Sequence, residues 1–435
     1  MNNQVLGTWD FVTGNASVTE DDAHGMMCFS TIAANIPGQF VGKAPKANFY
    51  LFRTEDVSSE YPIEEFNWAT GAERADSTGA DIISSSLGYG YEFNPPVADY
   101  PFSDLNGDIT MSARAADIAA AKGLLVFNSA GNSGNDYWKR IITPGDADSI
   151  ITVGAVSTTG VVGSFSSYGP AADGRIKPDV ASVGVAAIVQ GAGNTIATSN
   201  GTSFACPNMA GLGTCLWQGF PEVNNMRIVR ALREAGSIAS TPNDRIGYGI
   251  PDMKKAFVIL LKRFYSQQIQ QAGCNTSIKW TSKIGSNMSF QVQRKLPTDA
   301  DYVNIQTING TGNFALKNFA YTDDLSSFST PINIAYRIRM NLDTDSSFFF
   351  PPVTISHLNS CNTYRFTGNG NWTTAANWAG NLIPPSPLPA GSSIIIDPVI
   401  TGECILNIVQ QVQAGGYFEV RSGKKLTVIG DLIIQ

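Results

Sequence analysis

The chain has 435 residues, of which 43% are hydrophobic and 15% are charged, and its formal net charge is −7 at neutral pH. This composition is typical of a folded protein with several domains and excludes an intrinsically disordered chain. The sequence has no basic stripe that would neutralise phosphates and no apolar run long enough to cross a membrane, so we expect neither nucleic acid binding nor a transmembrane segment.

Residues 1–265 alternate short apolar segments with segments typical of helices. A helix is expected at residues 112–122, and Gly123 after it is typical of a helix C-terminus. Apolar strands are expected at residues 47–52, 81–83, 124–127 and 150–153. Short apolar strands separated by helices predict an α/β domain, with a parallel sheet covered by helices on both faces.

Two β-rich modules are expected after this domain. Residues 266–360 contain segments that alternate apolar and polar residues, such as Phe290–Arg294 and Tyr336–Arg339, which predicts an all-β sandwich. Residues 361–435 contain a proline-rich stretch and then short apolar strands punctuated by glycines. This pattern predicts a small β-rich module, for which a solenoid-like stack is one arrangement.

The six cysteines form no Cys-x-x-Cys pair and no cluster with histidine, so we expect no metal site built from them. Cys274 and Cys361 lie near the two ends of the middle module. They either form a disulfide that joins those ends or remain unpaired. In the second case all six cysteines are unpaired, and Cys206 and Cys215 simply pack in a core.

The sharpest local motif is Gly201–Pro207, with the sequence Gly-Thr-Ser-Phe-Ala-Cys-Pro. The apolar segment after it predicts a buried helix with Ser203 at its N-terminus. Backbone N–H groups at that end of a helix can stabilise a developing negative charge. Taken alone, the motif favours a plainer interpretation, in which the serine only caps the helix.

A serine hydroxyl becomes a good nucleophile only when a base removes its proton. The sequence contains two histidines, and His357 falls in the middle module, so His24 is the candidate base in the first domain. Asn132 follows a predicted strand, where its carboxamide could donate a hydrogen bond to an oxyanion. Each residue alone also fits a plainer role, as a surface histidine and as an asparagine turn.

The order of four motifs along the chain favours the catalytic roles over the plainer ones. His24–Gly25, Ser86–Gly88, Ser129–Asn132 and Gly201–Pro207 follow one another in the order found in the subtilisin-like serine proteases, which residues 1–265 resemble. The resemblance implies that Ser203 is the nucleophile and His24 the general base. It also implies an oxyanion hole formed by Asn132 and the backbone N–H of Ser203.

The resemblance further implies a primary specificity pocket between two walls. One wall consists of Ser86, Leu87 and Gly88, and the other of Ser129, Ala130 and Gly131. The substrate would be a polypeptide in an extended or unfolded segment. Its backbone would pair with Ser86–Gly88 as an added strand.

A catalytic aspartate that precedes the histidine is also implied, and the sequence lacks an obvious one. Asp10 is not followed by the expected glycine, and Asp21 and Asp22 are too close to His24 to orient the far side of its ring. We therefore expect the native protein to extend upstream, with the aspartate, a strand and a signal peptide. The alternative is a degenerate protease. We predict that the chain as given has very little activity.

The remaining motifs concern cofactors and attachment. Asp104–Asp108 resembles part of a calcium loop but lacks the glutamate that completes it, so a polar turn is favoured. No cofactor is required, and a structural calcium ion stays open. Residues 266–360 resemble fibronectin type III-like domains of bacterial secreted proteins, and Asn371–Trp378 resembles the start of β-rich repeats in bacterial surface proteins. The tryptophans there either bind glycans or pack in a core.

The sequence therefore predicts a secreted or cell-surface serine endopeptidase that acts on polypeptides. Its C-terminal modules would attach it to a cell surface or to glycans. Two other functions are compatible with the same motifs. The first is a catalytically inactive surface or binding protein built on a protease scaffold. The second is a structural adhesin whose function lies in residues 266–435.

Overall fold

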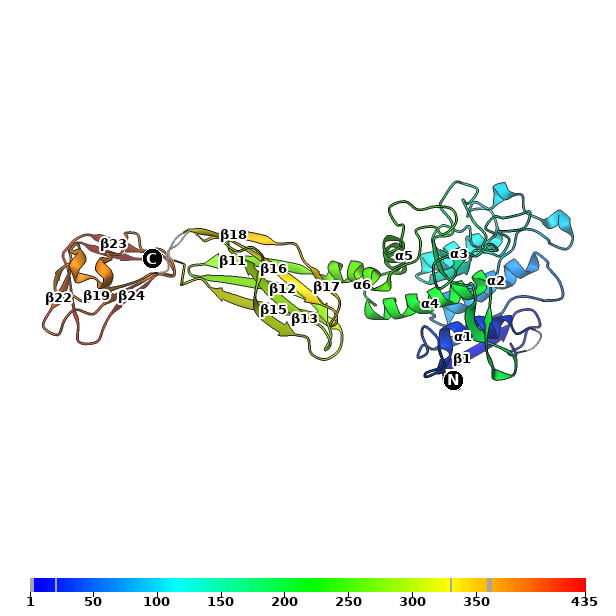
Figure 1. Cartoon of the computed structure of the whole chain (residues 1–435), viewed down its shortest axis with the longest axis horizontal. Coiled ribbons are helices and arrows are strands. Elements are labelled where there is room, and N and C mark those ends of the chain that lie inside the picture. The colour runs from blue at the N-terminus through cyan, green and yellow to red at the C-terminus, as the bar shows by residue number, and fades with distance from the viewer. Residues whose placement is uncertain (1–3, 20–21, 329–330, 358–361) are drawn as a thin grey trace. The chain divides into compact units, whose positions relative to one another are not determined.

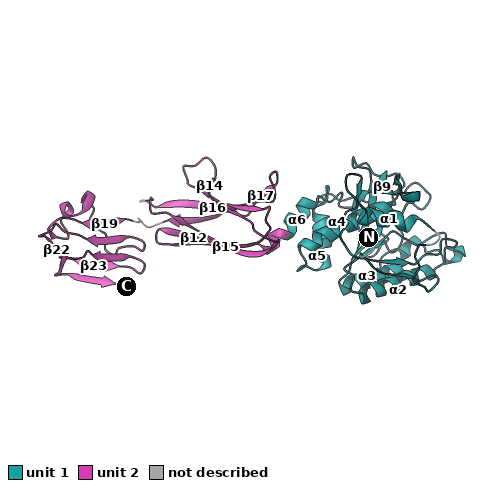
Figure 2. Cartoon of the chain, turned by 90° about the horizontal axis from the view of Figure 1, so that it is seen from below, with its two compact units in different colours: residues 1–260 teal, residues 261–435 magenta. Residues whose placement is uncertain are grey.

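The computed structural model describes residues 4–19, 22–328, 331–357 and 362–435. Contacts within the chain separate two compact units, Met1–Leu260 and Leu261–Gln435. Figure 1 labels the elements along the chain, and Figure 2 colours the first unit teal and the second magenta. No helix in the described ranges is both long and apolar enough to span a membrane.

A four-stranded parallel sheet forms the centre of the first unit, in the order β5-β6-β7-β8. Its strands are β5 (Ile82–Ser85), β6 (Leu125–Ser129), β7 (Ile151–Val156) and β8 (Val180–Val183). Every residue of β6 and β7 is buried. Such continuously buried strands are typical of a parallel sheet with both faces covered, so the predicted α/β class is confirmed.

Helices cover both faces of this sheet. Val126 of β6 belongs to an apolar cluster with alanines of α2 (Ile63–Ser77) and α3 (Met111–Lys122). The next residue, Phe127, lies against Gly213 of α4 (Thr202–Gly219). Because successive side chains of a strand point to opposite faces, α4 covers the face opposite α2 and α3. The helix α4 contacts all four strands, so it is the central helix of the unit.

The other elements of the first unit surround this centre. As predicted, α3 ends before Gly123, whose left-handed conformation (φ 113°) suits glycine. The strands β1 (Val5–Asp10) and β4 (Phe49–Arg53) form a parallel pair. The remaining α-helices are α1 (His24–Ala33), α5 (Asn225–Glu234) and α6 (Met253–Leu261). Two small antiparallel pairs complete the unit: β2 (Asn35–Ile36) with β3 (Phe40–Val41), and β9 (Ala187–Gln190) with β10 (Ile196–Ser199).

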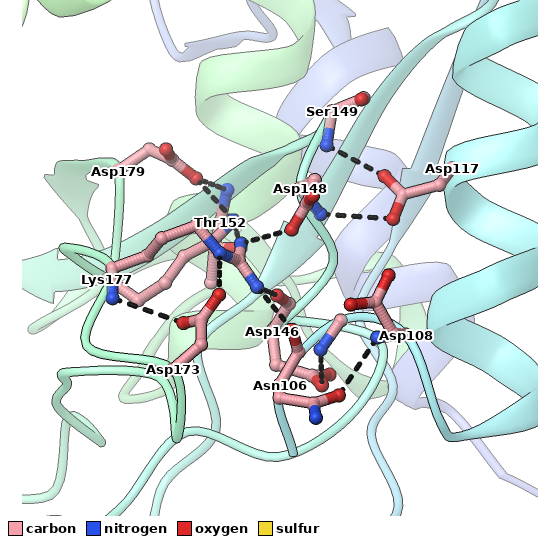
Figure 3. A network of polar contacts seen from close by, with 12 residues as sticks. Asn106, Asp108, Asp117, Asp146, Asp148, Ser149, Thr152, Asp173, Lys177 and Asp179 are labelled. Atoms are coloured by element: carbon pink, nitrogen blue, oxygen red, sulfur yellow. Dashed lines mark hydrogen bonds and ion pairs between the residues drawn. The ribbon is translucent and has the colours of Figure 1, made fainter. Parts of the chain in front are cut away.

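A polar network holds the loop in which a partial calcium motif was noted (Figure 3). The Asn106 side chain accepts a hydrogen bond from the backbone N–H of Asp108, which makes a local turn. The Arg175 guanidinium donates to the backbone oxygens of Asn106 and Asp146 and forms ion pairs with Asp148 and Asp173. Arg175 therefore holds the backbone of this loop and pairs with two acidic residues beside it. Within the described ranges, no group of three acidic, histidine or cysteine residues is arranged to hold a metal ion.

The second unit begins with two antiparallel sheets. One contains β11 (Ser266–Ala272), β12 (Asn275–Ile284) and β15 (Ala315–Asp324), and the other contains β13 (Ser289–Lys295), β14 (Val303–Asn309), β16 (Ile332–Asn341), β17 (Ser347–Phe349) and β18 (Val353–His357). Trp280 of β12 packs edge-on against Phe290 of β13, with ring centroids 5.6 Å apart, so side chains of both sheets share a core. The fibronectin type III-like assignment stays a prediction.

The last part of the second unit is a stack of short parallel strands. The pairings link β19-β21-β24, β20-β22-β25 and β23-β26, all parallel. These strands are β19 (Thr363–Phe366), β20 (Gly370–Asn371), β21 (Ser393–Ile396), β22 (Glu403–Leu406), β23 (Val409–Val412), β24 (Tyr417–Val420), β25 (Lys425–Val428) and β26 (Asp431–Ile434). Trp372 and Trp378 are 0% and 2% exposed and pack edge to face, so these rings belong to a core.

The cysteines differ in part from expectation. Cys274 is disulfide-bonded, and Cys361, the candidate partner in one of the two alternatives, lies outside the described residues. Cys206 is buried as predicted. Cys215 is exposed, so its expected place in a core is wrong. It lies on α4 at a position that faces away from the sheet, and its thiol donates to the backbone oxygen of Lys43.

Candidate active site

Ser203 lies in the first turn of the central helix α4. The N-cap of this helix is Gly201, and no side chain caps it. Ser203 is therefore not the cap, which removes the plainer interpretation of the motif. In the described part of the chain the Ser203 hydroxyl forms no hydrogen bond. The residue is 7% exposed, at the end of the helix where backbone N–H groups lack helical partners.

His24 is the first residue of α1 and is half-buried. The Asp22 carboxylate accepts a hydrogen bond from the His24 backbone N–H at 2.6 Å. The imidazole packs edge-on against the ring of Phe204, with centroids 6.2 Å apart. Burial lowers the pKa of His24, and the nearby negative charge of Asp22 opposes this shift in part. The neutral imidazole, which can accept a proton, is therefore favoured at neutral pH.

Cys28, which the sequence analysis did not single out, lies on α1 and contacts both His24 and Ser203. Its Sγ lies 3.6 Å from His24 Nε2 and donates to the backbone oxygen of Ser203 at 3.2 Å. Cys28 lies four residues after His24 on α1, so the two side chains share one helix face. The spacing of four residues, which places two side chains on one face if the segment is helical, was the signal available in the sequence.

Cys28 places His24 and Ser203 side by side where α1 meets α4. The Ser86 hydroxyl donates to the same Ser203 backbone oxygen at 2.8 Å. Among the described residues, no hydrogen bond joins the Ser203 hydroxyl directly to the His24 ring. Hydrogen bonds of a catalytic pair are often long in the absence of substrate. The catalytic pairing of Ser203 with His24 therefore stays a prediction.

Asn132 is held from the start of α4. Its Oδ1 accepts hydrogen bonds from the Thr202 backbone N–H at 2.9 Å and from the Thr202 hydroxyl at 3.0 Å. The Thr202 hydroxyl in turn accepts from the backbone N–H of Gly131 at 3.2 Å. The side chain is exposed, and within the described ranges its NH₂ group has no hydrogen-bond partner. This carboxamide presents a free donor beside the first turn of α4.

The two predicted pocket walls leave the sheet side by side. Strands β5 and β6 are parallel neighbours in which Ser85 lies opposite Asn128. Ser86–Gly88 and Ser129–Gly131 therefore occupy the carboxyl ends of adjacent strands, where ligand sites form in open α/β sheets. The Asn128 Nδ2 donates to the backbone oxygens of Leu87 at 3.1 Å and Ser129 at 2.9 Å. This side chain therefore fastens one wall to the other.

Asp10, which the sequence offers as a carboxylate before His24, binds other groups. Asp10, the last residue of β1, is 1% exposed and forms an ion pair with Arg53 at 2.8 Å. Its other oxygen accepts from the backbone N–H groups of Val12 and Thr13. Asp21 lies outside the described residues. In the part of the chain that is described, no carboxylate forms a hydrogen bond with the His24 ring.

Comparison with known proteins places the first unit in a family. The model of the subtilase family matches residues 1–249. Subtilisin DY of Bacillus licheniformis is 30% identical over 249 residues, which cover 57% of this chain and 81% of the relative. The serine protease AprX of Bacillus subtilis (strain 168) is 28% identical over 264 residues. The matched region is 53% of this chain and 56% of AprX, so the chain spans little more than half of that relative.

Similar solved structures include MycP1 from Mycobacterium smegmatis, which is 21% identical to this chain and has a TM-score of 0.47. The match covers 57% of this chain and 73% of MycP1. The family match itself rests on the sequence, because the family model covers more than half of the chain and the subtilisin relative is matched over most of its length. The chain therefore belongs to the subtilase family of serine proteases.

Proposed function

We propose that the first unit hydrolyses peptide bonds in extended polypeptides through an acyl-enzyme intermediate. Ser203 is the nucleophile, His24 is the base, and Asn132 stabilises the oxyanion. The observation that carries this proposal is the convergence of all three side chains on the first turn of α4. Cys28 contacts both His24 and Ser203, and Thr202 orients Asn132.

Each group has a defined task in the reaction. The Ser203 hydroxyl attacks the substrate carbonyl carbon while His24 accepts its proton. The negative charge that develops on the carbonyl oxygen is met by the Asn132 NH₂ group and the Ser203 backbone N–H. His24 then donates the proton to the leaving amine. Water, activated by the same imidazole, hydrolyses the acyl-enzyme and regenerates Ser203.

The substrate backbone would lie along the wall Ser86–Gly88. In the described ranges, the backbone groups of Ser86 and Gly88 form no hydrogen bonds. Exposed backbone groups at a sheet edge pair readily with an added extended strand. An unfolded or extended segment can form these bonds, whereas a folded helix cannot. This supports a preference for unfolded polypeptides.

The proposed mechanism also requires a group that orients the His24 ring. We expect an aspartate outside the described residues to bind the far ring nitrogen, as the family resemblance implies. Loss of this aspartate in a subtilisin lowers turnover by about 3 × 10⁴. A degenerate protease remains the alternative. We further propose an extracellular location, with the second unit as an attachment region.

A fluorophosphonate probe tests the proposed nucleophile, because it phosphonylates activated serines without requiring turnover. We expect a stoichiometric adduct on the peptide that contains Ser203 after prolonged incubation of the full chain, and its loss in Ser203→Ala. Ser199→Ala, on nearby β10, is the matched control and should keep the adduct. A folded chain that acquires no adduct at Ser203 would favour the non-catalytic binding protein.

A further inference from the structure

The side chain of Ile142 lies against both predicted walls of the specificity pocket. A Cβ atom added at Gly88 would lie 2.7 Å from both Cδ1 and Cγ1 of Ile142. A Cβ atom added at Gly131, on the other wall, would lie 3.5 Å from Cγ1 of the same side chain. Ile142 is thus in van der Waals reach of both walls at once. A side chain that enters between the walls must therefore share that space with Ile142.

Backbone hydrogen bonds hold Ile142 in this position. Tyr89 and Thr143 form a reciprocal antiparallel bridge, with N–H to oxygen distances of 2.7 Å and 3.1 Å. This bridge joins the residue after Gly88 to the residue after Ile142. A turn follows, in which the Gly145 N–H donates to the Ile142 oxygen at 2.8 Å. The backbone is therefore held at the isoleucine itself and at the residue after it.

The walls themselves resist separation. Asn128 donates to both walls, through the backbone oxygens of Leu87 and Ser129, and its side chain is 0% exposed. Farther along the chain, the Tyr91 hydroxyl bonds to the Ser133 hydroxyl. Tyr91 also stacks on Trp138, with centroids 5.0 Å apart and ring planes at 20°. The segments that follow the two walls in the chain are therefore also joined to each other.

We infer that this peptidase cleaves after small residues, namely glycine, alanine and serine, and discriminates against large apolar residues at that position. The inference rests on the proposed function, because it assigns the substrate class of the same site. A small side chain fits above Ile142, whereas a phenylalanine or leucine would displace it or push apart walls that Asn128 holds. Because one methylene in an apolar pocket changes discrimination by about 10- to 200-fold, a benzyl group should cost at least about 10-fold.

Competition against the fluorophosphonate measures this preference without requiring turnover. Two tetrapeptide aldehydes that differ only in their last residue, alanine or phenylalanine, are added to the full chain before the probe. We expect the alanine aldehyde to slow Ser203 labelling at a concentration at least about 10-fold lower than the phenylalanine aldehyde. In Ile142→Gly the potency of the phenylalanine aldehyde, relative to that of the alanine aldehyde, should rise by at least about 10-fold.

Ile142→Ala provides a second variant with a smaller cavity and should shift the ratio in the same direction. Ile118→Ala, on the exposed face of α3, is the matched control and should leave the ratio of the two aldehydes unchanged. Circular dichroism and a thermal melt establish that each variant is folded. Equal competition by both aldehydes in the wild-type chain, or an unchanged ratio in both Ile142 variants, would overturn the inference while Ser203 labelling still supports the proposed function. A folded wild-type chain without labelling would overturn both.

Discussion

The Asn132 carboxamide oxygen accepts two hydrogen bonds from one residue, the backbone N–H and the hydroxyl of Thr202, at 2.9 Å and 3.0 Å. Thr202 directly precedes Ser203 on α4, so the same helix turn positions the proposed nucleophile and orients the proposed oxyanion donor. With its oxygen occupied, the carboxamide can only present its NH₂ group to a ligand. Thr202 is therefore a positioning residue for Asn132.

Removal of the Thr202 hydroxyl should loosen this orientation. We expect Thr202→Val to slow fluorophosphonate labelling of Ser203 by about 10-fold, because one of two hydrogen bonds is lost. Thr202→Ser keeps the hydroxyl and should restore most of the rate. Asn132→Leu removes the donor itself and should cost about 100- to 1,000-fold, the range known for a subtilisin. Equal rates in Thr202→Val and Thr202→Ser would contradict the positioning role.

Cys28 is expected to be unreactive despite its place beside His24. Burial raises the pKa of its thiol to about 12, and the Ser86 hydroxyl opposes the shift only in part. The thiolate is the reactive form, so alkylation near pH 8 should be slow. Iodoacetamide should modify the exposed Cys215 well before Cys28, as measured by mass mapping of the adducts over time. Modification of Cys28 as fast as Cys215 would show that the thiol is activated instead.

A buried ion network stabilises the amino end of the central sheet, where β7 and β8 begin. Lys177 Nζ lies 2.9 Å from Asp179, and the two side chains are 1% and 2% exposed. Asp179→Asn should lower the free energy of unfolding by about 3–5 kcal/mol, because it leaves a buried ammonium group without a counter-charge. The matched control is Glu234→Gln, which breaks an exposed ion pair with Arg230 and should cost less than about 1 kcal/mol. Urea unfolding measures both, and equal effects would contradict the burial argument.

Glu60 should make the stability of the first unit depend on pH. Burial, followed by repulsion from Glu64, Glu55 and Glu92, raises the pKa of Glu60 to about 7, against 4.5 for the free side chain. The folded state thus keeps a proton that the unfolded state releases between these values. The resulting stabilisation is complete below pH 4.5 and is lost as the pH rises through about 7.

Substitution by glutamine should remove this dependence. Near pH 8, Glu60→Gln should raise the free energy of unfolding by about 1 kcal/mol, after allowance for solvent screening. Near pH 5 it should change little, because the carboxyl group is already mostly protonated. Glu73→Gln, on an exposed position of α2, serves as the control. Urea titrations at both pH values measure the effect, and a gain that is equal at both would rule out the ionisation of Glu60 as its cause.

Local patterns in the sequence were sufficient to predict the central elements. The buried strands β6 and β7 and the end of α3 at Gly123 follow from apolar runs and one glycine that the backbone geometry requires. The position of Ser203 in the first turn of a buried helix follows from the glycine before it and the apolar segment after it. These features depend on neighbours in the chain, which a sequence pattern contains.

The contacts that complete the site join distant segments, and no local pattern contains them. The Cys28 thiol reaches the Ser203 backbone oxygen across 175 positions in the chain. Ile142 contacts both walls only because the Tyr89–Thr143 bridge folds its segment back onto Gly88. The wrong placement of Cys215 has the same origin, because the side of α4 that packs on the sheet depends on tertiary contacts.

The dependence of Ser203 labelling on His24 tests most directly whether the two residues act together. The rate of fluorophosphonate labelling is measured in the full chain and in His24→Ala, with His357→Ala, in the second unit, as the control. In a subtilisin, removal of the histidine costs about 2 × 10⁶ in turnover and removal of the aspartate about 3 × 10⁴. Because no aspartate binds the His24 ring in the described part of the chain, His24→Ala should slow labelling by about 10- to 100-fold and His357→Ala should not. Labelling of Ser203 at the same rate in His24→Ala and in the unsubstituted chain would contradict the proposed catalytic pair.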